Sequence, residues 1–327
     1  MIFLGIETSC DETSLAIYCT NKGILAAKTA SQADIHSRFG GVVPEVASRN
    51  HILKLESLFN ECLSISGLGT SDIDCIGVTN APGLIGALFV GVGFAKGLGY
   101  SLGIPVIPIN HLSAHILAAE IEHEELKPPY LALIISGGHT HIYDVDKALN
   151  YRLLAKTLDD AAGESFDKVA KMIGLGYPGG PAIEKLAKDG DSDAVKLPIA
   201  MKKDDNFSFS GLKTAVLNAY NTGEYSKADL AASFQKTTAE TLVLKTMRIA
   251  RRFGRKRITV AGGVACNGYI RNSFAEACSE GEKVYFPSFR LCTDNGDMIA
   301  YAASRFYNRR RFFPLEGRAY DTQPEIG

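Results

Sequence analysis

Two histidines four positions apart are the first residues of this sequence that could do chemistry. His111 and His115 lie in the stretch INHLSAHILA, directly after the apolar run IPVIPI. The run predicts a buried strand, Asn110 a helix N-cap, and the following segment a helix. At about 3.6 residues per turn, both imidazoles fall on one face of that helix, where they can bind one metal ion.

Histidines also cap helices or satisfy buried polar groups, so the pair alone leaves a purely structural role open. A zinc metallopeptidase helix reads HExxH with Glu as general base, and Leu112 occupies that position here. The peptidase interpretation therefore lacks its base. A metal site also needs a third ligand, and we select Asp294, at the start of a predicted helix in CTDNGDMIAYAASRFY.

The composition is that of an ordinary globular protein. The chain has 327 residues, 46% hydrophobic and 22% charged, with a formal net charge of -1, so it is long enough for two domains and favours no particular polyanion. Its seven cysteines have no CxxC spacing, which favours a reducing compartment over a disulfide framework or a thiolate zinc site. The N-terminus is acidic too early for a signal peptide, and the longest apolar stretch is broken by glycine. We expect a cytoplasmic protein with no membrane segment.

The elements that must position these residues repeat one pattern. Residues 2–7 and 15–18 predict two strands around the polar turn TSCDETS, and residues 130–145 repeat this pattern around GGHT. The repeat suggests a duplicated α/β architecture with a nucleotide between its halves. Hydroxyls and acids of the first turn can approach a phosphate or a metal, although a solvated hairpin is the plainer alternative. These residues are Thr8, Ser9, Glu12, Thr13 and Ser14.

Further elements follow from composition and periodicity. Residues 73–78 predict a buried strand, and the glycine-rich segment 81–103 predicts a helix that packs closely. Residues 158–225 read as an insertion into the second half, and residues 228–252 predict a long amphipathic helix. The strand RITVAGG and a helix that begins near Asn267 resemble the way α/β folds place backbone against a nucleotide.

Cations gather at two places in the sequence. The first cluster ends the long helix, and the second crowds the C-terminal segment. The clusters are Arg248, Arg251, Arg252, Arg255, Lys256 and Arg257, and then Arg305, Arg309, Arg310, Arg311 and Arg318. The first suits either a helix C-terminus, whose dipole favours cations, or a polyanion. The second lies beside Phe312 and Phe313 and is harder to explain by a helix end, so it favours nucleic acid.

Taken together, these motifs resemble the TsaD family, which transfers a threonylcarbamoyl group to N6 of adenosine 37 in tRNAs that read ANN codons. The motifs span nearly the whole chain and are GIETSCDETS, GGVVPEVASRNH, NHLSAH, LIISGGHT, DDAAGESFDKVAK, YPGGP, FSFSGLKT, AGGVACNG and CTDNGDMIAYA. The resemblance implies an α/β fold of the actin, hexokinase and Hsp70 (ASKHA) type, with two RNase H-like halves and a cleft between them. We expect residues 1–125 to form the first half and 126–327 the second, with the C-terminal helix a candidate to pack across onto the first.

The resemblance also implies the roles of individual residues. One iron or zinc ion would be bound by His111, His115 and Asp294. The substrate threonylcarbamoyl-AMP would lie along Ile134, Ile135, Ser136, Gly137 and Gly138, with its ribose and adenine contacted by Asp167, Gly180, Glu184 and Asn267. Many members have Asp where this chain has Glu184, so this contact is the least secure. No catalytic side chain is assigned, and Glu12 is the candidate.

The implied chemistry is physically simple. Threonylcarbamoyl-AMP is a mixed anhydride with a good leaving group, so the adenine amine can attack its carbamoyl carbon without an enzyme nucleophile. A metal ion would act as Lewis acid and template.

The implied partners are tRNA, a TsaB-like paralogue of the same fold and a TsaE-like ATPase, in a heteromeric complex. The surface of residues 35–54, or another part of the N-terminal half, is the candidate contact for the paralogue. Three other classes of protein stay open: a small-molecule kinase or ATPase of the same fold, a metalloendopeptidase, and a nucleotide-dependent scaffold. Histidine ligands disfavour the kinase, because kinases of this fold bind magnesium through oxygen.

Overall fold

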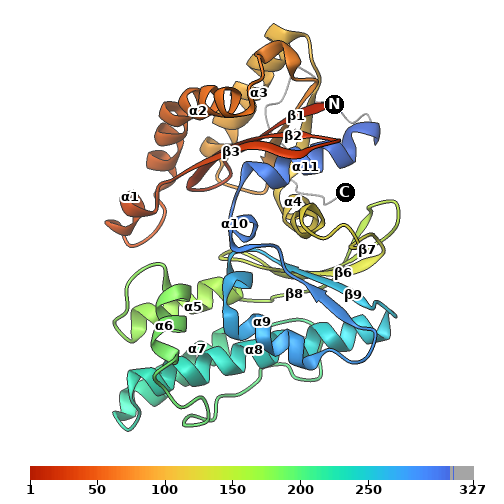
Figure 1. Cartoon of the computed structure of the whole chain (residues 1–327). Coiled ribbons are helices and arrows are strands. Elements are labelled where there is room, and N and C mark those ends of the chain that lie inside the picture. Colours follow the sequence, from red (N-terminus) through yellow and green to blue (C-terminus); the bar gives the residue numbers. More distant parts are fainter. Residues whose placement is uncertain (310–311, 313–327) are drawn as a thin grey trace. The chain divides into compact units, whose positions relative to one another are not determined.

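The computed structural model describes residues 1–309 and 312 and divides the chain into two units. Unit 1 comprises Met1–Glu122 and the chain from Thr293 onward, and unit 2 comprises His123–Cys292. Each unit has its own five-stranded sheet (Figure 1). The expected boundaries counted the C-terminal helix with the second half but named it as a candidate to pack onto the first, and it belongs to unit 1.

The sheet of unit 1 has the strand order β3-β2-β1-β4-β5. Its strands are β1 (Ile2–Glu7), β2 (Glu12–Cys19), β3 (Gly23–Ser31), β4 (Cys75–Ala81) and β5 (Val106–Asn110). The first three form an antiparallel meander, and β4 and β5 continue the sheet parallel to β1. The polar turn and the strand–turn–strand pattern predicted at the N-terminus are confirmed.

The sheet of unit 2 repeats this topology with the order β10-β9-β6-β7-β8. Its strands are β6 (Tyr130–Ile135), β7 (Thr140–Val145), β8 (Tyr151–Lys156), β9 (Arg257–Ala261) and β10 (Lys283–Tyr285). Again three strands form a meander and two are parallel to the first. Because the order and directions match those of unit 1, the predicted duplication is present in the structure.

Helices pack on both sheets. In unit 1 they are α1 (Ala33–Ser37), α2 (Pro44–Ser66), α3 (Ile85–Leu102), α4 (His111–Ala118) and α11 (Gly296–Phe306). In unit 2 they are α5 (Ala162–Met172), α6 (Gly179–Ala187), α7 (Ser210–Thr222), α8 (Lys227–Arg252), α9 (Gly268–Ala277) and α10 (Phe289–Cys292). Segment 158–225, expected as an insertion, carries α5, α6 and α7, and α8 matches the predicted long helix to within one residue at its start.

Glycine lets α11 lie directly on the sheet of unit 1. Leu4 and Ile6 of β1 face a core shared with α2 and α3, whereas Gly5 between them faces α11. A Cβ on Gly5 would overlap the backbone of Gly296 and Ala300, and a Cβ on Gly77 of β4 would lie 2.6 Å from the Cβ of Ala303. This close approach brings the start of α11, shown in blue beside the red strands of Figure 1, to the end of β1 and the start of β2.

Helix α3 also packs through glycine. Among the described residues it is the helix that is long and apolar enough to cross a membrane by length and composition alone, a test that core helices also pass. Here it packs on β4 and α2, and a Cβ on Gly91 or Gly86 would overlap Thr8 or Ser48. By contrast, a Cβ on Gly93 or Gly97 would meet no atom within 4 Å among the described residues. The packing role predicted for the glycines of this segment holds for Gly86 and Gly91.

A matched pair of substitutions tests the helix–sheet contact. We expect Gly5→Ala to lower the free energy of unfolding by about 1–3 kcal/mol, because the added methyl group must displace the backbone of α11. Gly93→Ala adds a methyl group at a helix position where nothing lies in its way. This change should raise the free energy of unfolding by up to about 1 kcal/mol. Urea unfolding of both variants measures the difference, and equal stability of the two would contradict the packing described.

Candidate metal centre

The two histidines and the aspartate selected from the sequence lie together in unit 1. One ligand atom from each of His111, His115 and Asp294 lies within 4.8 Å of the others. Asp294 Oδ1 is 3.4 Å from His111 Nε2 and 3.1 Å from His115 Nε2. Both rings therefore turn the same nitrogen toward one carboxylate, as ligands of a single ion would.

Helix α4 presents the two histidines because of its cap. The side chain of Asn110 accepts hydrogen bonds from the backbone N–H groups of Leu112 (2.9 Å) and Ser113 (3.2 Å), so the helix begins at His111. The predicted N-cap is confirmed. One turn later His115 lies on the same face, and the two rings pack edge to face with centroids 4.6 Å apart.

Asp294 is positioned by the start of α11. Asn295 caps this helix by accepting from the N–H of Met298 (2.8 Å), and the N–H of Gly296 donates to Ser14 Oγ of β2 (2.8 Å). Gly296 itself lies against Leu15, where a Cβ would be 2.6 Å from the backbone carbon. These contacts fix Asp294, the residue before the cap, next to the sheet of unit 1 and the turn after β1.

A carboxylate that we did not select from the sequence supports the group. Glu7, at the end of β1, has a fully buried side chain, and its Oε2 lies 3.0 Å from His111 Nδ1. Glu7 also accepts from Thr79 Oγ1 (2.6 Å) and from the N–H of Ser9 (2.5 Å). Because the carboxylate accepts from Nδ1–H, Nε2 of neutral His111 keeps its lone pair for a metal. The sequence signal was an acid that ends an otherwise apolar strand.

The charges in the group also fit a divalent cation. Burial disfavours the charged form of His111, but Asp294 and Glu7 outweigh it and hold the pKa of this histidine well above its usual range. Burial likewise opposes ionisation of Asp294, yet His111 and His115 lower its pKa far below the ordinary value. Two carboxylates thus need positive charge between them, which a proton or a metal ion can supply.

The donor set fits zinc or ferrous iron. Two ligands that each lie about 2.0–2.2 Å from one ion are about 3.0–3.5 Å apart, and the two Nε2 to Oδ1 separations of 3.1 and 3.4 Å fall in this range. Imidazole with a carboxylate suits these metals better than magnesium. The buried Nδ1 of His115 has no hydrogen-bond partner among the described residues, so packing on His111 orients this ring.

Three hydroxyls of the first turn form hydrogen bonds within unit 1 instead of facing a phosphate. Thr8 Oγ1 donates to the carbonyl of Ala87 (2.9 Å), and Thr13 Oγ1 lies 2.7 Å from Nδ1 of the buried His51. Ser14 bonds to Thr29 and Gly296. These three hydroxyls are therefore committed within unit 1, which corrects the suggestion that they are free for a ligand.

Glu12 differs from its neighbours. Burial, with help from Asp294 and Asp11, raises the pKa of Glu12 to about 9, so its side chain is protonated at neutral pH. Its Oε1 accepts from Ser31 Oγ (3.2 Å). A neutral carboxylic acid can donate a hydrogen bond, whereas it cannot act as a general base.

In unit 2, the residues expected along the adenylate form a tight glycine turn. Ile134 and Ile135 are fully buried in β6, so their side chains face the core, and the turn Ser136–His139 closes with hydrogen bonds of 2.8 and 3.1 Å. Gly137 and Gly138 are exposed, and a Cβ on either would meet nothing within 4 Å among the described residues. This turn is open to a ligand.

The residues that we expect to contact the ribose and adenine also link three helices of unit 2 through hydrogen bonds. Asp167 of α5 accepts from the N–H of Gly179 (2.7 Å), next to Gly180 at the start of α6. Glu184 of α6 accepts from the N–H of Gly268 (2.8 Å), at the start of α9. Asn267 caps α9 (3.0 Å to the N–H of Ile270) and donates through its side chain to Gln235 (2.8 Å). Each of these side chains thus bonds to a residue of a neighbouring helix. Gln235, the partner of Asn267, was not predicted from the sequence.

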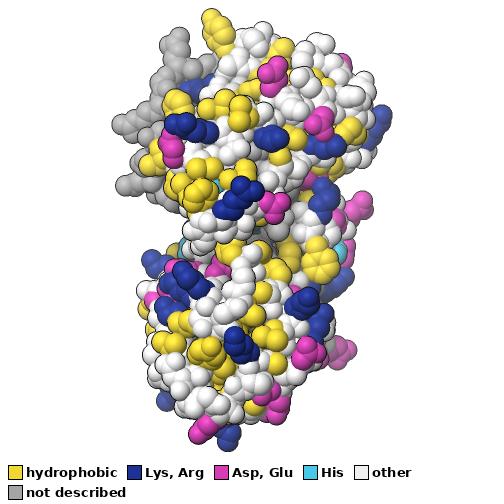
Figure 2. All heavy atoms as spheres, turned by 90° about the vertical axis from the view of Figure 1, so that its left-hand side faces the viewer, with side chains coloured by type: hydrophobic (Ala, Val, Ile, Leu, Met, Phe, Trp, Pro, Cys, Tyr) yellow, Lys and Arg dark blue, Asp and Glu magenta, His cyan; other side chains and the backbone are white. Residues whose placement is uncertain are grey.

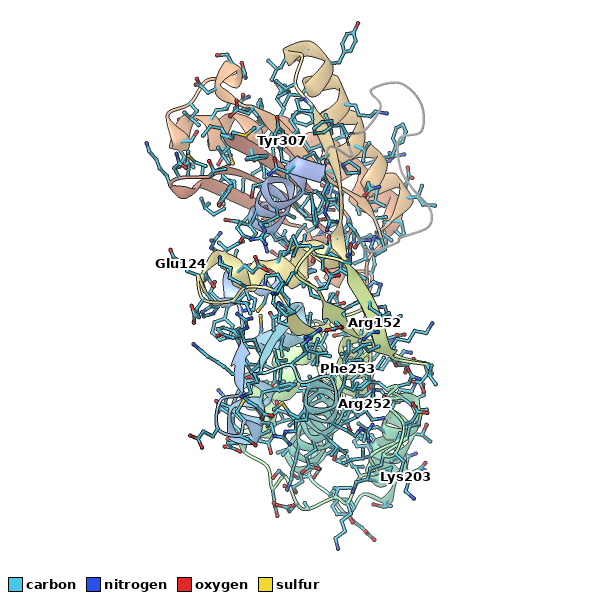
Figure 3. All side chains as sticks on the ribbon, turned by 90° about the vertical axis from the view of Figure 1, so that its right-hand side faces the viewer. Glu124, Arg152, Lys203, Arg252, Phe253 and Tyr307 are labelled. Atoms are coloured by element: carbon cyan, nitrogen blue, oxygen red, sulfur yellow. The ribbon has the colours of Figure 1, made fainter. Side chains whose placement is uncertain are left out.

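The arginines at the end of α8 are paired with groups of their own unit. Their partners are Asp205 for Arg248 and Arg252, Glu282 for Arg251, Asp144 for Arg255 and the carbonyl of Glu125 for Arg257. Arg152 and Arg252 also lie over the ring of Phe253, at 5.0 and 5.2 Å (Figure 3). These interactions within unit 2 give the arginines structural roles, whereas binding of nucleic acid by the cluster stays a prediction.

The second cluster can be followed only in part. Arg305 pairs with the buried Glu120 (3.0 Å), and Arg309 lies 5.1 Å from the ring centroid of Phe306. Arg310, Arg311 and Arg318, together with Phe313, lie outside the described residues.

Comparison with solved structures defines the fold. HypF from T. kodakarensis superimposes with a TM-score of 0.65 at 15% identity, over 94% of this chain and 48% of that one. Component A of (R)-2-hydroxyglutaryl-CoA dehydratase from Acidaminococcus fermentans gives 0.58 at 16%, over 92% and 97%. The chain is an α/β protein of the actin, hexokinase and Hsp70 type, here with a histidine–carboxylate group on its first unit.

Sequence comparison is more specific. Residues 23–301 match the family profile of TsaD, tRNA N6-adenosine threonylcarbamoyltransferase. Curated proteins of that name are 50% identical in Clostridium perfringens (strain SM101), over 92% of this chain and 91% of that one, and 49% identical in Thermosipho africanus, over 94% and 95%. The chain belongs to the TsaD family of tRNA N6-adenosine threonylcarbamoyltransferases.

The buried carboxylate behind His111 provides a test of the metal centre. We expect Glu7→Gln to weaken metal binding by about 10- to 100-fold, because the amide supports His111 less well than a charged acceptor. Glu120→Gln is the matched control, since Glu120 is also a buried carboxylate of unit 1 but pairs with Arg305 and Tyr301. Titration of each purified apoprotein with zinc against a chromophoric chelator measures the affinity, and equal losses in both variants would contradict the role of Glu7.

Proposed function

We propose that this enzyme transfers the threonylcarbamoyl group from threonylcarbamoyl-AMP to N6 of adenosine 37 in tRNAs that read ANN codons. Membership of the TsaD family supports the reaction. We further propose that one ferrous iron or zinc ion, bound by His111, His115 and Asp294, assists it, and that it takes place in the cytoplasm. The observation that carries the metal proposal is the convergence of both Nε2 atoms on Asp294, with Glu7 behind His111.

The chain's own residues then have distinct tasks. The exposed Gly137 and Gly138 offer backbone N–H groups to a phosphate, and Asn267 offers an amide to adenine or ribose. In the transfer, the N6 amine forms a bond to the carbamoyl carbon while the bond from that carbon to the phosphate oxygen breaks, and AMP leaves with the amine's proton. A bound ion would supply a Lewis acid for an oxygen of the donor. Neutral Glu12 can donate a hydrogen bond to an oxygen that gains negative charge.

The rival functions lack comparable support. A zinc peptidase of the HExxH type needs a general base where Leu112 lies buried with 4% exposure. A kinase or ATPase of this fold would bind magnesium, which prefers oxygen ligands to two imidazoles. A scaffold without catalysis does not account for a centre in which Glu7 orients His111 and the cap at Asn295 places Asp294.

Two substitutions in different units separate the metal from the nucleotide. We expect Asp294→Ala to lose bound metal and nearly all turnover, because it removes the carboxylate ligand. Asn267→Ser keeps an N-cap for α9 but lacks the amide, so it should raise the KM for threonylcarbamoyl-AMP while metal content is unchanged. Nucleoside mass spectrometry of tRNA, with metal analysis of each variant, makes the measurement. Full metal retention in Asp294→Ala would rule out the assigned ligand.

We also propose that unit 1 binds a TsaB-like paralogue, in a complex that includes a TsaE-like ATPase, through the face that carries α1, α2 and α3. Hydrophobic side chains are exposed on the side of α1 and α2 (Figure 2). The exposed residues on these helices and the loop after α1 are Ile35, Phe39, Ile52, Leu53, Ile65, Ile85, Phe89 and Tyr100. Gly93 and Gly97 lie between Phe89 and Tyr100 along α3, and their open Cβ positions admit a closely packed helix.

Charge introduced into this face should weaken the complex. We expect Phe89→Asp to lower the affinity for the paralogue at least about tenfold, because an aromatic anchor at the centre of an interface is typically worth 1–2 kcal/mol or more. Leu158→Asp in unit 2 is the matched control, since both side chains are 56% exposed. Light scattering and calorimetry with the purified paralogue test this, and an unmodified chain that stays monomeric beside the paralogue would refute the surface.

A further inference from the structure

Two cysteines of unit 2 that are distant in sequence have their thiols at the same junction of the fold, beside the start of α10. Cys266 ends a short 3-10 helix, Gly263–Cys266, that follows β9, and Cys292 is the last residue of α10. Both thiols face the start of α10, and each affects the acidity of the other. Cys266 Sγ is 3.9 Å from the carbonyl oxygen of Phe289, and Cys292 Sγ is 3.5 Å from that of Pro287.

Arg271 of α9 holds the two segments around this thiol pair. Its guanidinium donates to the carbonyl of Ala265 (2.6 Å), next to Cys266, and to that of Pro287 (2.8 Å). It also lies 3.2 Å from Cys292 Sγ, and stacks over Phe289 at 4.6 Å. Arg271 therefore holds the segments that carry the two thiols together, and its cation lies beside Cys292.

The two thiols differ in access and in acidity. Cys266 is partly exposed, whereas Cys292 is fully buried, and both are free cysteines. The hydrogen bond from Cys292 lowers the pKa of Cys266 against the effect of burial, and Arg271 lowers it further. The same hydrogen bond and burial raise the pKa of Cys292. A reachable thiol with thiolate character beside a second, sheltered thiol is the arrangement of an attacking and a resolving cysteine.

We propose that Cys266 and Cys292 form a redox-sensitive dithiol that low-molecular-weight disulfides, such as oxidised glutathione, convert to an intramolecular disulfide. The Cys266 thiolate attacks one sulfur of the oxidant, a mixed disulfide forms, and the other half leaves as thiolate. Cys292 then attacks the Cys266 sulfur, a second thiolate leaves and accepts the proton of Cys292. Two protein thiols are oxidised and one small disulfide is reduced to two thiols.

The consequence depends on the place of Cys266 in the chain. It directly precedes Asn267, the cap of α9, and follows Gly262, whose φ of 95° and contact with Ile135 fix the end of β9. A sulfur–sulfur bond of about 2.05 Å must draw this loop toward α10. If Asn267 contacts the adenylate as proposed above, oxidation displaces that contact and lowers affinity for threonylcarbamoyl-AMP.

Peptide mapping tests the chemistry without reference to any activity. The purified full-length protein is equilibrated with glutathione buffers of rising oxidised fraction, alkylated and digested, and the disulfide-linked peptides are identified by mass spectrometry. We expect one linkage, Cys266 to Cys292, that reduction reverses. Cys266→Ala should prevent it, whereas Cys278→Ala should not; Cys278 is the matched control because it is also a partly exposed cysteine of unit 2.

Nucleotide binding by the same samples tests the consequence. Calorimetry with threonylcarbamoyl-AMP should show affinity about tenfold lower after oxidation, restored by dithiothreitol and absent in Cys266→Ala. A stable glutathione adduct on Cys266 with Cys292 left free, or no linkage at any buffer ratio, would overturn the dithiol. Unchanged affinity of the fully linked protein would overturn the switch, whereas lack of binding by the reduced protein would instead count against the proposed function.

Discussion

The fully buried carboxylate of Glu7 is the charge on which the arrangement of unit 1 depends. A buried carboxylate is costly unless each of its lone pairs finds a donor, and here a backbone N–H, a hydroxyl and an imidazole supply them. The donors come from the turn after β1, from β4 and from the first residue of α4. The hydrogen bonds to the Glu7 carboxylate therefore fix where these three segments meet. They also orient His111 so that its Nε2 faces Asp294.

Close packing brings Asp294, the third candidate ligand, to this point. Gly5 and Gly77 leave the sheet surface bare of side chains, so α11 lies against the strands and its first residues reach β2. Larger side chains at these positions would hold the helix away from the sheet and move Asp294 from the histidines. The stability of the helix–sheet contact and the geometry of the candidate metal centre are thus two results of the same packing.

Local features could be predicted from the sequence because they depend on neighbouring residues. The cap at Asn110, the long helix α8 and the strand–turn–strand repeat follow from periodicity and from short polar side chains at element ends. The convergence of His111, His115 and Asp294 was also predicted, since residue types and motif resemblance suffice to select ligands. Roles for the residues of unit 2, such as Asn267, remain predictions.

Other features depend on contacts between distant residues, which a single sequence does not reveal. The roles of Glu7 and Thr79 were missed, because an acid at a strand end looks the same whether water or a buried histidine faces it. The packing of α11 onto unit 1 was named as a candidate, but the glycines that allow it, Gly5 and Gly77, lie more than 200 positions before the helix. The arginines at the end of α8 and just after it have partners in unit 2, among them Asp205 and Asp144, that the sequence did not reveal.

Anomalous diffraction from crystals of the purified, metal-loaded enzyme would test the central claim most directly. Data collected on both sides of the iron and zinc absorption edges identify the element and its position. The account predicts one anomalous peak in unit 1, bonded at about 2.0–2.2 Å to Nε2 of His111, to Nε2 of His115 and to the carboxylate of Asp294. A loaded crystal with no peak at these three residues, or with its metal bound elsewhere, would contradict it.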